Sequence, residues 1–404
     1  MLKVGRLSPM VSNSLAGTCK IILVCVLVAI GMISVGQTGP QVSALSAIIL
    51  DQKTGKVLWS KDPDTPRYPA STTKIMTALL LIEHCRPEEM IKAPDDVETV
   101  QEASLHLKPG EQVSAREMLY ALMLRSANDG CYAVAVHISG SVGEFAKLMN
   151  ARAKQIGCTH THFDNPHGLN DENHTISARD LGLIACEAMK YPEFREVVKT
   201  YRHKIVRSMN QEDLSLVNKN KWLKKDPTAD GIKTGWTVPA GHCYVGSATR
   251  NGFRVVTVVM KSDNWETDHQ AMLDWAFTGN VVVKVPAAAP SSVPVAGGVA
   301  KSVAVAVPDA VGYVRPRDSQ AMPKVSFVVP EHISAPIVAG QPIGTARYSD
   351  ETGWKMDVPL VAAGPVAKAS LLSMSSNTGP IIWIGFAIGA MLIVRRQWLR
   401  KRAL

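Results

Sequence analysis

The chain has 404 residues and a mass of 43.6 kDa, which is long for one average domain and sufficient for two or three. Hydrophobic residues make up 46% and charged residues 20%, a composition that excludes a disordered or collagen-like chain. The formal net charge of +9 would suit a nucleic-acid-binding protein, but three basic residues precede residue 37 and five lie in the last ten residues. The body between these ends is nearly neutral, so nucleic acid is not an expected partner.

The N-terminal end resembles a targeting segment. Residues 21–36 are uncharged and mostly apolar, and they follow a basic start that ends at Lys20. This order is typical of a secretory signal, and the small residues at 42–44 offer a cleavage site. We therefore assign residues 1–44 as a leader, with an uncleaved membrane anchor as the alternative.

The C-terminal end carries a second hydrophobic segment. Residues 381–394 are apolar all round, and the uncharged stretch extends back to residue 369. We expect a transmembrane helix over 369–394, followed by a basic cytoplasmic tail over 395–404, with an amphipathic surface helix as the alternative. Because positive charges stay inside, the sequence predicts a cell-membrane protein with one C-terminal anchor and its folded domains outside the cytoplasm.

Residues 45–280 alternate between strand and helix patterns. The periodicity predicts, in chain order, a hairpin over Ser46–Ser60, a helix from Ser71 that ends before Pro87, a largely helical region from Ser114 to Thr200, strands over 232–236, 243–249 and 253–261, and an amphipathic helix over 268–278. The last two strands are joined at Asn251-Gly252, a strong hairpin turn. The sheet is thus assembled from both ends of the segment around a helical insert, which predicts one α+β domain.

The composition changes at Val281. Valine, alanine, proline and glycine dominate up to Pro308, and short alternating strands with Pro and Gly turns follow to about Leu360. Apart from His332 this part offers no histidine and no carboxylate cluster suited to catalysis. We expect a small β-rich domain over 281–368.

Five cysteines follow the leader, and no two of them form a Cys-x-x-Cys pair. Their number is odd and their spacing is too sparse for a disulfide scaffold, so we expect mostly buried thiols, with one bridge left open. They are Cys85, Cys131, Cys158, Cys186 and Cys243.

Ser71-Thr72-Thr73-Lys74 stands at the first turn of a predicted helix. Residues three apart share a helix face, so the Lys74 amine can reach the Ser71 hydroxyl and serve as its base if the lysine is neutral. Alone the pattern is weak, because a helix cap followed by a solvated lysine has the same sequence.

Two further short patterns follow in order. Ser126-Ala127-Asn128 falls in a break between two helical runs, where the simple interpretation is a helix cap. Lys233-Thr234-Gly235 lies in a short apolar strand, where Gly235 lets a ligand approach closely and the simple interpretation is an edge strand with a protective lysine.

Taken together, the three patterns resemble the penicillin-binding protein and serine β-lactamase superfamily in their order and in their helix, loop and strand contexts. The surrounding segments RYPASTTKIMTALL, LRSANDG, DNPHGLN and ADGIKTGWT are similar to the low-molecular-mass penicillin-binding proteins that are D-alanyl-D-alanine carboxypeptidases. The resemblance covers roughly residues 45–280, and APIVAGQPIGTARY in the tail is similar to the second, β-rich domain of that family. It implies a transpeptidase-like fold and a penicillin-sensitive serine carboxypeptidase that acts on peptidoglycan stem peptides without a cofactor.

The resemblance also implies roles for single residues. Ser71 would be acylated, Lys74 would be its base, and Ser126 would relay a proton to the leaving D-alanine. Asn128 would bind the substrate amide, Lys233 would supply positive charge, and Thr234 would bind the substrate carboxylate. Gly235 and Trp236 would complete the substrate-binding residues. The backbone amides of Ser71 and Trp236 would form the oxyanion hole.

The chain departs from the family pattern in the segment after the last paired strand. KSDNWETD lacks the arginine by which many relatives hold the terminal carboxylate, so carboxylate recognition needs another source. No Glu-x-x-x-Asn pattern occurs between Asn128 and Lys233, so rapid hydrolysis of β-lactam antibiotics is not expected, and these compounds should act as covalent inhibitors.

Three other functions fit parts of the sequence. Four histidines in fifteen residues, His160, His162, His167 and His174, could bind zinc in a metal-dependent hydrolase, although they more often lie in turns. A non-catalytic wall-binding scaffold and a D,D-endopeptidase acting on cross-linked peptidoglycan are the remaining alternatives.

Overall fold

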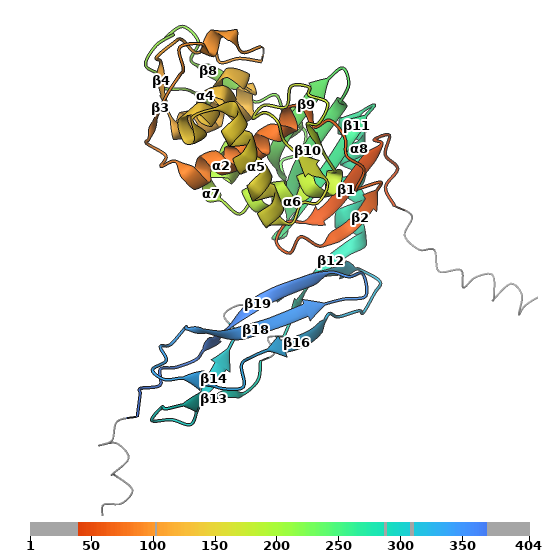
Figure 1. Ribbon diagram of the computed structural model, residues 1–404. Helices are drawn as coiled ribbons and strands as arrows, with labels where there is room; N and C mark the ends of the chain where they lie inside the picture. Colours follow the sequence, from red (N-terminus) through yellow and green to blue (C-terminus); the bar gives the residue numbers. More distant parts are fainter. Residues whose placement is uncertain (1–38, 102, 287–288, 308–310, 370–404) are drawn as a thin grey trace, which may run out of the picture. The chain divides into compact units, whose positions relative to one another are not determined.

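The computed structural model describes residues 39–101, 103–286, 289–307 and 311–369 (Figure 1). The described residues leave out nearly all of the predicted leader, the predicted transmembrane segment after residue 369, and the basic tail. What the sequence predicts for these three segments therefore remains a prediction. Among the helices of the described part, none is both long and apolar enough to cross a membrane.

A five-stranded antiparallel sheet forms the centre of the first domain. Its spatial order is β2-β1-β11-β10-β9, so the N-terminal hairpin pairs with strands that come some 200 residues later. The strands are β1 (Ser46–Asp51), β2 (Val57–Lys61), β9 (Ala229–Thr237), β10 (Gly241–Arg250) and β11 (Phe253–Ser262). The predicted assembly of the sheet from both ends of the segment is confirmed, and β9 is an edge strand.

The helical insert lies between β2 and β9. It contains η1 (Ala70–Thr73), α2 (Lys74–His84), η2 (Val97–Thr99), α3 (Ala115–Tyr120), η3 (Ala121–Arg125), α4 (Asn128–Ser139), α5 (Val142–Ile156), α6 (Ala178–Ala188), α7 (Pro192–Lys199) and η4 (Lys221–Lys224). Short two-stranded hairpins connect these helices, namely β3 (Met90–Lys92) with β4 (Gln112–Ser114), β5 (Thr161–His162) with β6 (Thr175–Ile176), and β7 (Arg202–Lys204) with β8 (Ser215–Val217).

Local sequence signals fix several helix ends. Ser141 accepts a hydrogen bond from the Glu144 amide at the start of α5, and Ser177 accepts one from Asp180 at the start of α6. Both are serine caps followed three residues later by an acid, which also suits the positive end of the helix dipole.

Helices cover both faces of the sheet. In β1, Ile48 and Leu50 belong to the core that contains α2 and the rest of the insert, whereas Ile49 packs with Met272 of α8 (Trp265–Gly279) on the other face. Because successive residues of a strand point to opposite faces, the apolar run of β1 serves both layers. Helix α2 is surrounded by the insert and is buried over most of its length, which places its first turn inside the domain.

A β-rich part follows α8 directly. Strands β12 (Asn280–Val285) and β15 (Val311–Pro316) pair, and a second sheet has the order β16-β18-β19-β14-β13-β17. Its strands are β13 (Ser292–Ala296), β14 (Ser302–Ala306), β16 (Lys324–Val328), β17 (Ile333–Ser334), β18 (Pro342–Ser349) and β19 (Lys355–Ala362). This part has a separate core, with Ala346, Tyr348 and Leu360 fully buried. The predicted order of an α+β domain before a β-rich one is thus observed, while the boundary between residues 280 and 281 stays a prediction.

The five cysteines of the described part are all free thiols. Cys131, Cys186 and Cys243 are buried, as expected for small apolar side chains, and Cys85 and Cys158 are half-buried. The bridge that the sequence left open is not formed among these residues.

Candidate active site

Ser71 and Lys74 meet at the junction of η1 and α2. The Lys74 Nζ donates hydrogen bonds to Ser71 Oγ at 3.0 Å, to Asn128 Oδ1 at 2.7 Å and to the His167 carbonyl at 2.7 Å. Lys74 is 0% exposed, and the N-cap of α2 is Thr73 rather than Ser71. The alternative of a helix cap with a solvated lysine is therefore wrong.

Burial also changes the protonation of Lys74. Removal from water lowers the pKa of this amine to about 8, and the positive charge of Lys219 contributes in the same direction. Burial is the largest cause of this shift. The pKa of Lys233 is itself lowered well below its usual value, first by burial and then by the charge of Lys74. With a pKa of about 8, roughly one tenth of the Lys74 amine is neutral at pH 7.

Ser126 reaches the site through an unusual turn. Helix α3 continues into the π-helical η3, and Ser126 then adopts a left-handed conformation with φ of 68°. Wide π turns and left-handed non-glycine residues recur at functional sites. The N-cap of α4 is Ala127, which makes no side-chain capping bond, so Ser126 does not cap this helix. Its side chain lines the same pocket as Ser71.

Asn128, at the start of α4, links this turn to the lysine. Its Oδ1 accepts from Lys74, and its Nδ2 donates to the Gln101 carbonyl at 3.0 Å. Both ends of the amide are thus used, which fixes its orientation in the site.

Strand β9 forms the opposite wall. Lys233 is 1% exposed and its Nζ donates to the Thr234 carbonyl at 3.0 Å, so it is not a solvated edge lysine. A Cβ atom on Gly235 would lie 3.0 Å from the Ser71 amide nitrogen, which explains why a glycine stands here. Trp236 follows at the rim with 59% of its surface exposed.

These elements enclose a pocket of about 740 Å³. Ser71, Ser126, Asn128, Thr234, Gly235 and Trp236 line it, and Lys74 and Lys233 are buried beneath its surface. All eight residues that the sequence singled out are therefore in or directly under one pocket.

The pocket also contains residues that the sequence analysis missed. The exposed Lys219 lines it, as do His242 of β10 and Trp265 of α8. Lys219 lies in an irregular segment before η4 without any motif, so only the fold reveals that its charge belongs to the site.

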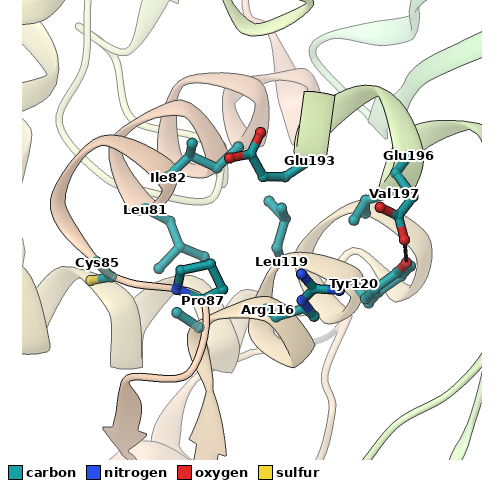
Figure 2. Close-up of a pocket in the computed structure, with 11 residues that line it drawn as sticks. Leu81, Ile82, Cys85, Pro87, Arg116, Leu119, Tyr120, Glu193, Glu196 and Val197 are labelled. Carbon is teal, nitrogen blue, oxygen red and sulfur yellow. Dashed lines mark hydrogen bonds between the residues drawn. The ribbon is translucent and has the colours of Figure 1, made fainter. Parts of the chain in front are cut away.

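A second pocket, of about 490 Å³, lies between α2, α3 and α7 (Figure 2). Apolar side chains such as Leu81, Leu119 and Val197 line it, with Arg116 and Glu193 at its edge. Its lining contains no serine and no lysine, and we therefore place the active site in the first pocket.

The loop that contains the four histidines contacts the active-site segment through hydrogen bonds. His174 is buried, with its Nε2 3.0 Å from Thr73 Oγ1, and its Nδ1 accepts from the Asp164 amide at 3.0 Å. Burial lowers the pKa of His174 to about 4 and that of His167 to about 3, so both rings are neutral. His160 and His162 are exposed. Among the described residues, these four histidines do not form a group whose ligand atoms are close enough to share an ion, so the zinc-hydrolase alternative finds no site here.

Gly168 explains how closely this loop approaches η1. Its φ is +87°, and a Cβ atom here would lie 1.8 Å from the Ala70 carbonyl oxygen. Only glycine fits, and its position directly after His167 brings the His167 carbonyl to Lys74.

Two family models match the chain. One, described as D-alanyl-D-alanine carboxypeptidase, matches residues 33–264, and the other, described as the C-terminal domain of penicillin-binding protein 5, matches residues 279–368. The chain belongs to the D-alanyl-D-alanine carboxypeptidase family.

Individual relatives agree with this membership. The D-alanyl-D-alanine carboxypeptidase DacF of Bacillus subtilis is 33% identical over 355 residues, which are 83% of this chain and 89% of the relative. The structure of penicillin-binding protein 5 from Haemophilus influenzae matches with a TM-score of 0.66 and 27% identity, covering 82% of this chain and 100% of that one. A variant of the Streptomyces K15 DD-transpeptidase matches with a TM-score of 0.56 and 30% identity, covering 59% of this chain and 99% of that one.

The serine D-alanyl-D-alanine carboxypeptidase and penicillin-binding protein expected from the motifs is thereby confirmed. The fold is confirmed as a transpeptidase α+β domain followed by the β-rich domain that accompanies it in this carboxypeptidase family.

Proposed function

We propose that Ser71 is the nucleophile of this carboxypeptidase and that its substrates are peptidoglycan stem peptides ending in D-alanyl-D-alanine. Ser71 Oγ attacks the carbonyl carbon of the penultimate D-alanine, the peptide bond breaks, and the terminal D-alanine leaves. Water then cleaves the ester on Ser71 and regenerates the hydroxyl. The observation that carries the proposal is the 3.0 Å contact between Ser71 Oγ and a fully buried lysine amine.

Lys74 acts as the general base in this scheme. Its neutral form accepts the Ser71 proton as the Oγ–C bond forms, and the 3.0 Å separation is within direct transfer distance. Ser126, on the same pocket wall, passes a proton to the nitrogen of the departing D-alanine. Asn128 holds the lysine through its Oδ1 and thereby aims the amine at Ser71.

Developing negative charge on the substrate carbonyl needs donors that are already in place. The backbone amides of Ser71 and Trp236 serve as this oxyanion hole. The close approach of Gly235 to the Ser71 amide brings the two segments together.

Recognition of the terminal carboxylate depends on Thr234, Lys233 and Lys219. Thr234 lines the pocket, and Lys233 is buried behind it. Lys219 lines the same pocket and supplies a positive charge, whereas the segment after β11 lacks the arginine of many relatives. A carboxylate bound there gains from a charge-assisted contact.

The test is mass spectrometry of the full chain after incubation with benzylpenicillin. We expect one adduct, located on the peptide that contains Ser71 and absent from a Ser71→Ala control. A protein that stays unlabelled would contradict the proposal and favour the scaffold, and an adduct on another serine would refute the role of Ser71.

A second assay distinguishes carboxypeptidase from endopeptidase activity. Release of D-alanine from a soluble pentapeptide supports the proposal. Cleavage of a cross-linked peptide dimer without D-alanine release would favour the D,D-endopeptidase alternative.

We also propose that the protein is held at the outer face of the cell membrane by a single C-terminal helix. The support is the apolar run over 381–394, followed directly by Arg395 and Arg396. This topology places the catalytic domain on the same side as its wall substrate.

A further inference from the structure

Three potential metal ligands gather at the end of α2 that is remote from Ser71. They are Cys85, the C-cap of α2, Glu89 just before β3, and His137 in the last turn of α4. One ligand atom of each lies within 4.8 Å of the other two, and His137 Nε2 is 2.9 Å from Glu89 Oε1. Among the described residues, no other group of three or more such side chains lies close enough together to share an ion.

The backbone holds these side chains in place. The Cys85 amide donates to the Leu81 carbonyl at 3.0 Å and ends the helix there. Glu89 closes a tight turn, since its amide donates to the Arg86 carbonyl at 3.0 Å and its Oε2 accepts from the Arg86 amide at 3.3 Å. The Glu89 carbonyl also accepts from Ala115 at 2.8 Å. The ligands are therefore positioned without help from an ion.

The hydrogen bond at Glu89 Oε2 has a second effect. It orients the carboxylate so that Oε1 faces His137, which is the arrangement in which an outer hydrogen bond aims a metal ligand. The side chains of His137 and Glu89 are 26% and 32% exposed, so an ion can enter from solvent.

We propose that Cys85, Glu89 and His137 bind one zinc ion. A thiolate, an imidazole and a carboxylate form a donor set that suits Zn²⁺ far better than Mg²⁺ or Ca²⁺, which prefer oxygen ligands alone. With Zn–S near 2.3 Å and Zn–N and Zn–O near 2.0–2.2 Å, tetrahedral ligand atoms are roughly 3.4–3.6 Å apart. Side-chain rotations give this spacing by shortening the longest present separation, which is at most 4.8 Å, and by lengthening the 2.9 Å between His137 and Glu89. Water takes the fourth position.

The position of the cluster indicates a structural purpose. Helix α2 begins at Lys74 and α4 begins at Asn128, and the zinc ion joins the opposite ends of these two helices. An eleven-residue helix is about 16 Å long, so the ion is too far from Ser71 to take part in acylation. Zinc bound here stabilises the frame that holds the two active-site side chains. Cys85 also borders the apolar pocket between α2, α3 and α7, and its sulfur points away from Pro87 (Figure 2).

The experiment uses the full chain, purified in detergent, stripped with a chelator and titrated with Co²⁺. We expect one Co²⁺ per chain, a thiolate-to-cobalt charge-transfer band in the near ultraviolet, and loss of that band when Zn²⁺ displaces the cobalt. Thermal unfolding should shift upward by several degrees with Zn²⁺, because an ion that binds only the folded state stabilises it.

Two variants and a control locate the site. Cys85→Ser should abolish the band and weaken Zn²⁺ binding by at least ~100-fold, and His137→Gln should weaken binding while the band persists at high cobalt concentration. Cys158→Ser removes the other half-buried thiol of the described part and should change neither.

Three results would overturn the proposal. They are a protein that shows no charge-transfer band, a band that survives Cys85→Ser, and an unchanged Zn²⁺ affinity in His137→Gln. If Cys85→Ser does not fold, His137→Gln decides the question, because this exposed position tolerates glutamine without repacking the core.

Discussion

The burial of Lys74 predicts how the rate of Ser71 acylation depends on pH. With a pKa of about 8 rather than the ordinary 10.5, the neutral amine makes up roughly one molecule in ten at pH 7 instead of about one in three thousand. The low-dielectric position of this one amine therefore increases the active form by ~300-fold at neutral pH.

The second-order rate constant for acylation by benzylpenicillin, measured by stopped flow on the full chain, should follow this fraction. Because the base must be neutral, the rate should rise about tenfold per pH unit below pH 8 and level off above it. A rate that is independent of pH below 8, or one that continues to rise towards pH 10, would refute the role of a buried Lys74 as base.

Replacing Lys219 tests the charge contribution to the same pKa. Lys219→Gln removes a cation that lowers the pKa of Lys74, so the rising limb should move to higher pH. The shift should be small beside the total lowering of the Lys74 pKa, because burial is the larger cause and is unchanged. Lys221→Gln, an exposed neighbour outside the pocket lining, is the matched control and should leave the profile in place.

Three substitutions and a truncation test the remaining steps. Lys74→Ala should abolish acylation while circular dichroism and gel filtration show a folded protein; near-normal labelling would count against the base. Thr234→Ala should slow turnover of peptides with a free terminal carboxylate more than of amidated ones, and equal losses in kcat/KM would mean that Thr234 has another task. Gly235→Ala places a methyl group 3.0 Å from a backbone amide of the nucleophile segment and should slow acylation by about tenfold or more, whereas Gly143→Ala, with open space around it, should leave the rate unchanged. Removal of residues 370–404 should release a soluble, penicillin-reactive protein, and a truncated protein that stays in the membrane pellet after a high-salt wash would disprove the single anchor.

Contiguous patterns made much of this molecule predictable. The β1–β2 hairpin follows from an apolar run, a turn at Gly55 and a second run, all within fifteen residues. The three active-site patterns are equally local, and their order identifies a fold that brings them together. The sequence also indicated that the sheet closes around the insert, because strand patterns occur only near the two ends of the domain.

Features that depend on distant contacts could not be predicted. Lys219 has no pattern around it, and its effect on Lys74 exists only because the segment before η4 folds back over the pocket. The left-handed turn at Ser126 arises from a π-helix that ordinary periodicity does not reveal. Density along the chain does not show which potential metal ligands meet in space. The four histidines at 160–174 form no such group among the described residues, whereas Cys85 and His137, far apart in sequence, lie together with Glu89.

The His167 carbonyl is a main-chain group, and this has consequences for how the enzyme can vary. No ordinary substitution removes a backbone oxygen, so the acceptor at 2.7 Å from the Lys74 amine persists whatever side chain stands at that position. The hydrogen bond from Lys74 therefore does not depend on the imidazole of His167, but it does depend on the spacing of the loop. A single inserted or deleted residue between Asp164 and Gly168 would displace the oxygen, and with it the amine that it holds. In a collection of mutants, this loop should reject changes of length, and it should also reject substitution of Gly168, where only glycine fits.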